Sequence, residues 1–155
     1  PVALTDDMET ASSPKISMFT TTTNAVISSI CGAAGGTQAL VFNGALERLA
    51  ETVTVFPCTA SPTLTFRYKL SQGSAPCTAI TFPTTTEQVV VEYRTASMPS
   101  WVSLTSLTTT STSFLSRTVS LPNHVGGSNA TRFRWRQLIH SGAGQDVWAL
   151  DDVAL

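Results

Sequence analysis

The sequence predicts an all-β domain, a sandwich or jelly roll in which short antiparallel strands stack as two sheets. Three observations favour this class. Charged residues make up only 12% of the 155-residue chain, whereas a helical bundle needs many more Glu, Lys and Ala. Thr and Val, which favour strands, are abundant. Short segments of alternating hydrophobicity recur between turn residues. We therefore expect one domain over residues 1–155, without internal repeats.

In the first half of the chain, three stretches carry strand or turn signals. Thr20–Thr23 is either a loop or an edge strand. Residues 40–42, Leu-Val-Phe, form a short apolar strand that ends at the turn signal Asn43-Gly44. Residues 64–70 alternate apolar side chains with Thr, Arg and Lys, and they give the clearest amphipathic strand of the chain.

In the second half, two strands are expected to form a hairpin. Residues 87–95 and 101–104 are joined by a turn through Met98-Pro99, which places Tyr93 and Trp101 near the closed end. Residues 114–121 form another strand, which Pro122 ends. No segment has a convincing helical pattern.

The segment from residue 131 to residue 155 predicts the last two strands. Phe133 and Trp135 alternate with a stripe of three arginines, at positions 132, 134 and 136, as in a half-buried strand. We expect the arginines to face solvent, and contact with an acidic glycan or partner is the alternative. The three tryptophans, at positions 101, 135 and 148, would offer a sugar-stacking platform if they are exposed.

The final strand breaks its own alternation. Leu150 and Val153 are both apolar but lie three residues apart, so a plain strand would place them on opposite faces. If both are buried, the chain must bulge at Asp151-Asp152. The bulge would leave a carboxylate against the core, where an unpaired charge is too costly. We therefore expect a bound cation to neutralise it.

The acidic residues are concentrated at the ends of the chain. The first nine and last ten residues hold six of the ten: Asp6, Asp7, Glu9, Asp146, Asp151 and Asp152. The termini of a sandwich commonly lie close together, so these acids could meet in an oxygen-rich cage that suits Ca²⁺. The alternative is a set of solvated acids at the chain ends.

Other function classes find little support. A net charge of −1 gives no electrostatic signal for nucleic acid or an anionic membrane, and no apolar run has the length of a transmembrane helix. His124 and His140 have no zinc-site neighbours at ligand spacing. His140, Ser141 and Asp146 share one loop, but no nucleophile-elbow motif or oxyanion-hole signature accompanies them. We expect a protein that is not an enzyme.

The cysteines and a glycosylation signal favour an extracellular setting. Cys58 and Cys77 flank a strand and are the candidate disulfide pair. Cys31 would then be the odd cysteine, either free and buried or joined to another chain. The sequon that begins at Asn129 permits N-glycosylation. The start has no leader pattern, so we expect any secretion signal to have been removed or to lie elsewhere. Because the chain ends within an apolar strand, we expect a module of a longer protein.

Several of these motifs together resemble the reelin-type subrepeats. The resemblance rests on RFRW and WALDD in the last two strands, VVVEYRTASMPSW at Val89–Trp101, CGAAGGTQALVFNG at Cys31–Gly44 followed by Arg48 and Thr52, and DDMET at Asp6–Thr10. The similarity runs in order over nearly the whole chain. MAM domains and several carbohydrate-binding jelly rolls end in a similar strand. No EGF-like segment accompanies the motifs, and Asn43 stands where some relatives have a cysteine.

The resemblance implies a jelly roll of two antiparallel sheets with a structural Ca²⁺ at the junction of the first and last strands. It also implies that at least two of the three tryptophans occupy core positions. The implied side-chain ligands are Asp7, Glu9 and Asp152, with Asp6 and Asp151 as alternates, and carbonyls near Arg48 could contribute. The implied function is structural or adhesive, within a larger secreted or surface glycoprotein whose partners are other modules, copies of itself or glycans. The alternative is a carbohydrate-binding module.

Overall fold

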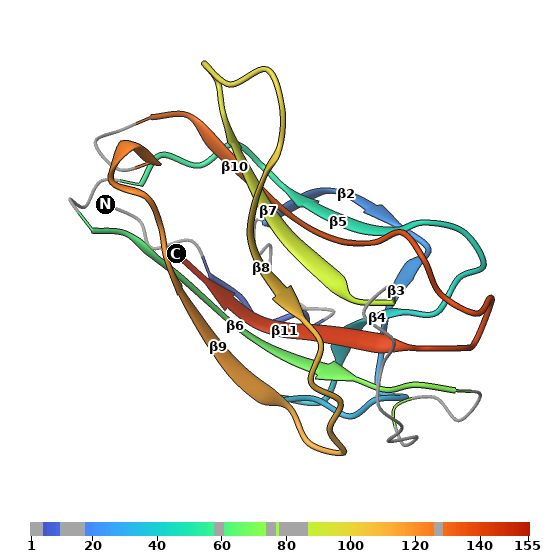
Figure 1. Ribbon diagram of the computed structural model, residues 1–155. Helices are drawn as coiled ribbons and strands as arrows, with labels where there is room; N and C mark the ends of the chain where they lie inside the picture. The colour runs from blue at the N-terminus through green and yellow to red at the C-terminus, as the bar shows by residue number, and fades with distance from the viewer. Residues whose placement is uncertain (1–4, 10–17, 58–60, 74–76, 78–86, 126–128) are drawn as a thin grey trace.

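A computed structural model describes residues 5–9, 18–57, 61–73, 77, 87–125 and 129–155. Its strands form two antiparallel sheets stacked face to face, which confirms the jelly-roll sandwich (Figure 1). Within these ranges the only helical element is a short 3-10 turn, η1 (Asn123–Val125).

The six-stranded sheet contains both ends of the described chain. In spatial order its strands are β3 (Ala25–Ser28), β4 (Ala39–Phe42), β11 (Trp148–Ala154), β6 (Thr63–Leu70) and β9 (Leu115–Ser120). The sixth strand, β1 (Thr5–Asp6), pairs with the far end of β11, on the same edge as β4. The strands expected near residues 40–42, 64–70 and 114–121 and the expected final strand are therefore confirmed, with slightly shifted bounds.

The five-stranded sheet carries the arginine stripe. Its spatial order is β2 (Phe19–Thr23), β5 (Arg48–Thr52), β10 (Thr131–Gln137), β7 (Val89–Thr95) and β8 (Val102–Leu107). β7 and β8 form the predicted hairpin, whose closed end projects beyond the sheets in Figure 1. The Thr run of β2 is an edge strand, one of its two expected states.

The main core lies between the two sheets. Alternate apolar side chains of β6 and β10 are buried there. Phe66 of β6 meets Trp135 of β10 edge to face, with ring centroids 5.4 Å apart. Trp148 stacks on Phe42, its partner in the β4–β11 register, at 3.7 Å. Trp135 and Trp148 are thus core residues, as at least two of the tryptophans were expected to be.

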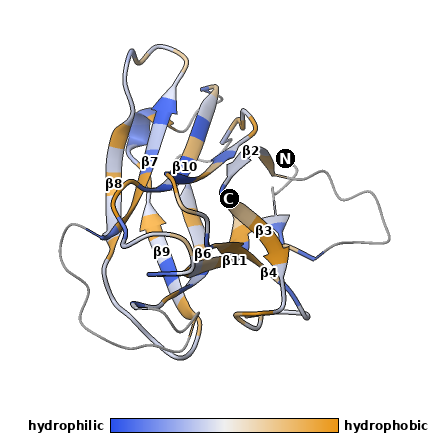
Figure 2. Ribbon diagram, turned by 90° about the vertical axis from the view of Figure 1, so that its right-hand side faces the viewer, coloured by the Kyte–Doolittle hydropathy of each residue, from blue (hydrophilic) through white to orange (hydrophobic). Residues whose placement is uncertain are grey.

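A second, smaller core lies on the other face of the six-stranded sheet. Val41 and Ala149 are fully buried there together with Cys31 and Cys77, and Phe114 packs against them. Strand β4 is therefore buried on both faces, which explains its unbroken apolar sequence. Figure 2 shows the resulting apolar colouring of β3 and β4.

The bulge predicted in the last strand is confirmed. The register between β11 and β6 shifts after Asp151, and Asp152 has a positive φ of 48°. As a result Leu150 and Val153 are both fully buried, and Asp151 is buried with them. A carboxylate therefore does lie against the core.

Candidate functional site

The two ends of the chain meet where β1 joins β11. Asp6 pairs with Val153 in antiparallel register, so Asp7 and Asp152 are the residues that adjoin this pair along the two chain segments. β4 pairs only with the first part of β11. The bulge thus occupies the interval between β4 and β1 on this edge of β11.

One loop supplies hydrogen-bond donors to this interval. We call residues 31–38, CGAAGGTQ, the glycine loop. Asp151 Oδ2 accepts the backbone N–H groups of Ala34 at 2.6 Å and Gly35 at 3.3 Å, while Oδ1 accepts the N–H of Asp152 at 2.9 Å. The buried carboxylate therefore has backbone partners of its own, which the sequence pattern did not indicate.

Glu9, from the other end of the chain, is bound by the same loop. Its Oε1 accepts the backbone N–H groups of Thr37 and Gln38, each at 2.7 Å, and its Oε2 accepts the Thr37 hydroxyl at 2.9 Å. These bonds, led by that of Gln38, hold the pKa of Glu9 below its ordinary value, although the charge of Asp7 opposes them. Glu9 is therefore stabilised as a carboxylate.

Two glycines let this loop approach the acids closely. A Cβ on Gly35 would lie 3.1 Å from Oδ1 of Asp152, and a Cβ on Gly36 would collide with the Glu9 carboxylate. Gly36 also has a positive φ of 70°, a conformation that glycine adopts without strain. Because the two glycines are consecutive, the carboxylates of Glu9 and Asp152 lie against the same turn.

Asp6 and Asp7 are placed differently from each other. Asp6 accepts the backbone N–H groups of Met8 and Met18, both at 3.0 Å, and these methionines are buried in the main core. Asp6 therefore anchors the chain after β1. Asp7 accepts the N–H of Glu9 at 3.4 Å.

Burial and mutual repulsion raise the electrostatic cost of the cluster. Burial raises the pKa of Asp151 above its ordinary value despite the three N–H donors, and the neighbouring charge of Asp152 adds to the increase. Asp152 is compensated from one side by Arg67, whose Nε lies 3.6 Å from Oδ2. A cation beside these acids would reduce the repulsion between them.

The chemistry of the donor set fits Ca²⁺, which takes roughly 6–8 hard oxygen ligands. The acids at the junction offer carboxylate oxygens only, and an ionised carboxylate has more acceptor sites than the N–H bonds above use. In the described part of the chain, however, no three acidic, His or Cys side chains already lie close enough to hold one ion. The acids at the junction thus suit Ca²⁺ by ligand type, and two of them, Glu9 and Asp152, approach the same turn.

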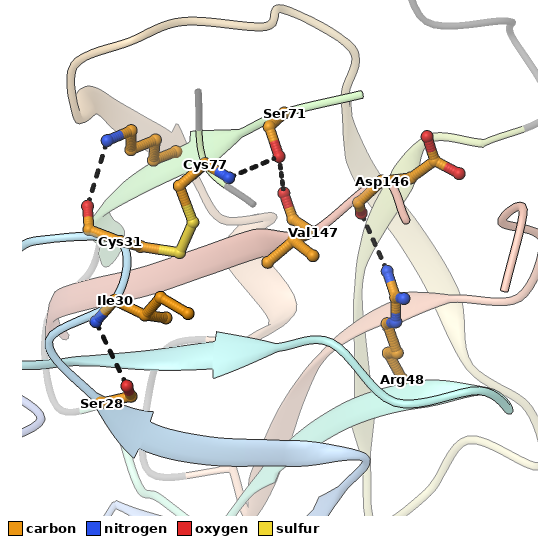
Figure 3. Close-up of a disulfide and its surroundings, with 9 residues drawn as sticks. Ser28, Ile30, Cys31, Arg48, Ser71, Cys77, Asp146 and Val147 are labelled. Atoms are coloured by element: carbon orange, nitrogen blue, oxygen red, sulfur yellow. Dashed lines mark hydrogen bonds between the residues drawn. A yellow bond between two sulfur atoms is a disulfide. The ribbon is translucent and has the colours of Figure 1, made fainter. Parts of the chain in front are cut away.

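The disulfide of this region corrects an expectation. Cys31 is bonded to Cys77, with Cα atoms 5.2 Å apart (Figure 3). The expected pairing of Cys58 with Cys77 is therefore wrong, and so are both expected states of Cys31, free or joined to another chain. Cys58 itself lies outside the described residues. The pair forms because both cysteines cover the outer face of β4 and β11 in the smaller core, a proximity that sequence spacing does not reveal.

Hydrogen bonds hold both sides of this disulfide. The backbone N–H of Cys77 donates to the Ser71 hydroxyl at 3.1 Å, which donates to the carbonyl of Val147 at 2.6 Å. Lys69 donates to the carbonyl of Cys31 at 3.1 Å. Figure 3 shows these bonds around the sulfur atoms. The first residue of the glycine loop is thereby fixed to the chain that follows β6.

A buried arginine at the opposite end of the sandwich was not predicted as a structural centre. Arg48 is fully buried and donates to Gln137 Oε1 at 2.9 Å and to four backbone carbonyls, of Gly44, Gly142, Gln145 and Asp146. Burial lowers its pKa to about 10, although Asp146 opposes the shift. Arg48 thus fixes the loop between β10 and β11.

The other polar residues named in the sequence analysis form hydrogen bonds to loop backbone groups. Asn129 is exposed, and its side-chain amide donates to the carbonyl of His124 at 2.6 Å. The two nitrogens of His140 lie against the carbonyls of Gly142 and Leu46. Asp146 accepts the backbone N–H of Ser141 at 2.7 Å. These contacts stabilise loops, and none brings a histidine nitrogen to a serine hydroxyl.

The arginine stripe lies on the outer face of the five-stranded sheet and is partly paired. Arg132 binds Glu51 at 2.8 Å, and Arg134 binds Glu92 at 2.6 Å. Arg136 also reaches Glu92, at 3.3 Å. Glu92, which is only 7% exposed, is therefore an organising residue of this face that periodicity alone did not reveal.

Comparisons with known proteins agree with this architecture. The family model described as Reelin subrepeat B matches residues 24–155. No curated protein matches the chain. Among solved structures, the K1 cleaved adhesin domain of Lys-gingipain from Porphyromonas gingivalis W83 is similar, with a TM-score of 0.65 at 11% identity over 99% of this chain and 97% of that one.

Carbohydrate-binding modules are similar too. The second family 16 module has a TM-score of 0.53 at 16% identity over 85% of each chain. TmCBM61 in complex with β-1,4-galactotriose has a TM-score of 0.54 at 12% identity, over 84% of this chain and 79% of that one. At these identities the likeness shows the fold alone. Within the ranges that the structure describes, no helix has the length and apolarity to cross a membrane.

Proposed function

Because the chain belongs to the Reelin subrepeat B family, we propose that it is a non-enzymatic module of a larger extracellular glycoprotein, closed by a structural Ca²⁺ at the junction of β1 and β11. The family and the shared fold support a structural or a carbohydrate-binding module. The observation that carries the calcium proposal is the convergence of Glu9 and Asp152, from opposite ends of the chain, on one turn of the glycine loop.

The residues that would hold the ion are Asp7, Glu9 and Asp152. Asp7 and Asp152 directly adjoin the Asp6–Val153 pair of β1 and β11 in the sequence, and Glu9 and Asp152 both lie against the glycine loop. Asp151 is fully buried, and Asp6 holds the chain after β1 through the backbone N–H groups of Met8 and Met18, so we assign these two acids mainly to shaping the site. When bound, Ca²⁺ would supply positive charge and several oxygen–metal bonds to a cluster of like charges.

The proposed role of this closure is to hold the first strand against the last. β1 has only two residues, and its partner strand is interrupted by the bulge immediately beside it. So short a pairing has few ladder hydrogen bonds of its own, and an ion shared by both strands would stabilise it. A closed module of this kind suits adhesion, matrix assembly or filament building with other modules or copies of itself.

Two features support the extracellular setting. The Cys31–Cys77 disulfide is typical of oxidising compartments, and Asn129 of the sequon is exposed. We propose that Asn129 carries an N-linked glycan. Attachment would use the amide nitrogen that donates to His124, so this contact would have to open before modification.

A carbohydrate-binding module is the second candidate function. Trp101 is the one tryptophan that is not buried, and it lies at the edge of the arginine-bearing sheet face. Aromatic rings at such positions can stack on sugars. This candidate does not depend on the calcium ion.

Thermal unfolding with Ca²⁺ and with chelator tests the main proposal. At an ion concentration 100 times its Kd, linkage gives about 2.7 kcal/mol of stabilisation, and chelator should remove it. The substitution Asp152→Asn should lose most of the response, whereas Glu47→Gln, an exposed acid on a loop away from the junction, should keep it. Identical melting curves with ion and with chelator would contradict the proposal.

A further inference from the structure

We propose that the outer face of the five-stranded sheet binds an acidic saccharide, with Trp101 as the aromatic platform and Arg94 as the main cation for a uronate or sulfate group. We call this surface the arginine face; it comprises Arg94, Trp101, Arg132, Arg134 and Arg136. The inference deepens the carbohydrate-binding candidate above by naming its site and ligand class, and it is independent of the calcium junction.

The sheet register gathers the cations on this face. On β10, alternation directs the three arginines outward. Arg94 of β7 is the register partner of Arg132 and so lies on the same face. The face therefore holds four of the nine Lys and Arg residues of a chain whose net charge is −1. Four cations are thus gathered on one face of the sheet, together with the carboxylates that pair with three of them.

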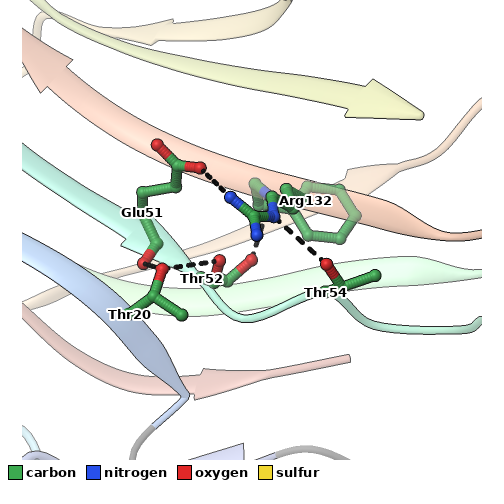
Figure 4. Close-up of polar contacts among 6 residues, drawn as sticks. Thr20, Glu51, Thr52, Thr54 and Arg132 are labelled. Carbon is green, nitrogen blue, oxygen red and sulfur yellow. Dashed lines mark hydrogen bonds and ion pairs between the residues drawn. The ribbon is translucent and has the colours of Figure 1, made fainter. Parts of the chain in front are cut away.

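Carboxylates neutralise the centre of the face but not its β7–β8 side. Glu92 is shared by Arg134 and Arg136, and Glu51 binds Arg132 (Figure 4). Arg94 takes part in none of the ion pairs formed between described residues. Its guanidinium instead lies 5.1 Å from the ring centroid of Trp101. Among the described residues, a cation that forms no ion pair is thus placed beside an aromatic ring.

The indole of Trp101 lies across the sheet. The guanidinium carbon of Arg134 is 4.3 Å from the ring centroid, although Arg134 is on β10, two strands away from β8. The side chains of Arg134 and Glu92 face outward but are only 15% and 9% exposed, so another side chain must shield them from solvent. The indole provides this shielding, and Trp101 as a whole is only half-buried.

Hydroxyl groups flank this platform. Glu92 is the register partner of Ser103 on β8, and on the other side Glu51 is the partner of Thr21 on β2. Ser103 and Thr21 are exposed. A row of register partners across the sheet therefore has a hydroxyl group at each end and charged side chains in its centre. This row offers both donors and acceptors to sugar hydroxyl groups.

An acidic saccharide matches this combination better than a neutral one. An aromatic ring can stack on the apolar side of a pyranose, and the planar guanidinium of Arg94 matches a carboxylate or sulfate through paired N–H donors. Sugar hydroxyls can use the flanking Ser and Thr. The net positive charge of the face complements an anionic chain, and this attraction should be weakened by salt because the face is open to solvent.

Titration of the Trp101 fluorescence tests the inference, since the other two tryptophans are buried. The probes are a β-1,4-linked triglucuronate and the β-1,4-linked glucotriose, which differ in the carboxylate at C6. We expect the triglucuronate to bind at least about fivefold more tightly in 50 mM salt, a difference that 500 mM salt removes. Arg94→Gln should weaken its binding about threefold to fivefold.

Variants with binding followed by NMR locate the site. Trp101→Ala should weaken triglucuronate binding about tenfold, a loss of about 1.4 kcal/mol, while Trp101→Phe should retain most of it. Arg117→Gln is the control, because it removes an exposed arginine of β9 in the other sheet, and it should bind as the wild type does. Equal weakening by Arg117→Gln and Arg94→Gln would overturn the location.

The remaining outcomes separate the two levels of the proposal. Equal binding of both trisaccharides, lost in Trp101→Ala but not in Arg94→Gln, would overturn the acidic class and leave the carbohydrate-binding candidate intact. If neither trisaccharide binds, and a heparin-derived sulfated tetrasaccharide does not bind either, the inference and the carbohydrate-binding candidate are both overturned. Neither result bears on the calcium response.

Discussion

Glu9 and Asp151, at opposite ends of the chain, accept backbone N–H groups from the same glycine loop. Glu9 is bound by the last two residues of the loop and Asp151 by two residues in its middle. The loop therefore links the N-terminal segment to the bulge of the final strand, whether or not an ion is present. Its first residue is fixed in turn by the Cys31–Cys77 disulfide.

A pair of glycine substitutions tests the link between loop and acid. Gly32 and Gly36 have nearly equal positive φ values, 71° and 70°, but only at Gly36 would a Cβ meet the Glu9 carboxylate. Gly32→Ala should lower the free energy of unfolding by about 1–2 kcal/mol through backbone strain alone. Gly36→Ala should lower it by about 1–3 kcal/mol more, since Glu9 must move and lose its N–H partners.

Urea unfolding of the two variants measures this difference. Equal losses of stability in Gly32→Ala and Gly36→Ala would contradict the assigned contact. Gly36→Ala should also weaken the response of the melting temperature to Ca²⁺, because Glu9 is one of the proposed ligands.

The disulfide should contribute substantially to stability. Cys31 and Cys77 are 46 residues apart in sequence, and closing a loop of this length in the unfolded chain corresponds to about 4 kcal/mol in the chain-entropy model. We expect the double change Cys31→Ser and Cys77→Ser to lower the free energy of unfolding by about 2–4 kcal/mol. Thermal melting under non-reducing conditions measures the loss. The single substitution Cys58→Ser is the control, and it should keep the wild-type melting temperature. A larger loss in Cys58→Ser than in the double variant would contradict the pairing.

Arg48 should be the most sensitive cation of the chain. Arg48→Met removes five hydrogen bonds and leaves buried carbonyls and the Gln137 amide oxygen without their donor. We expect a loss of about 3–5 kcal/mol, measured by urea unfolding. Arg117→Met, at an exposed position, should change stability by no more than about 0.5 kcal/mol. Similar effects of the two substitutions would disprove the structural role of Arg48.

Acid should destabilise the fold through Asp146. Burial tends to raise the pKa of this carboxyl, but N–H donors of Gly73 and Ser141 and the charge of Arg48 outweigh burial, so its pKa is lowered. A lowered pKa contributes stability that is present above the unfolded-state pKa, about 3.9, and that is lost as pH falls through the folded-state pKa. Asp151 acts in the opposite direction, because its raised pKa makes its charged form less favourable in the folded state.

The pH dependence of urea unfolding between pH 6 and pH 2 tests this assignment. Asp146→Asn should be less stable than the wild type at pH 6, by about 1–3 kcal/mol, and its stability should fall less steeply in acid. Glu47→Gln, at an exposed acid, should keep the wild-type slope. A wild-type slope in Asp146→Asn would contradict the prediction.

The sequence predicted the fold well where one face of a strand is buried and the other is not. The alternation in β6 and β10 is reproduced residue by residue in their burial. The spacing of Leu150 and Val153 predicted the bulge, because two apolar residues three apart cannot share a face of a regular strand. The meeting of the chain ends followed from the acid pattern and the sandwich class.

Other features depended on contacts that no local pattern records. The cysteine pairing depends on two loops crossing the outer face of β4 and β11, and spacing along the chain gives no sign of it. Strands β3 and β5 were not predicted, because Ala25–Ser28 and Arg48–Thr52 are short and lack a clear alternation of apolar residues. The backbone donors to Asp151 come from the glycine loop, more than a hundred residues away in sequence.

Calorimetric titration of the intact chain with Ca²⁺ tests the central claim most directly. We predict binding of one ion per chain, with a Kd of about 10⁻⁴–10⁻³ M or tighter, the range of extracellular calcium modules. Asp7→Asn and Asp152→Asn should abolish or strongly weaken this binding, and Glu47→Gln should leave it unchanged. Two results would contradict the claim that an ion closes the junction of β1 and β11. One is a wild type that shows no binding heat and an unchanged NMR spectrum at 10 mM Ca²⁺. The other is binding that survives both aspartate substitutions.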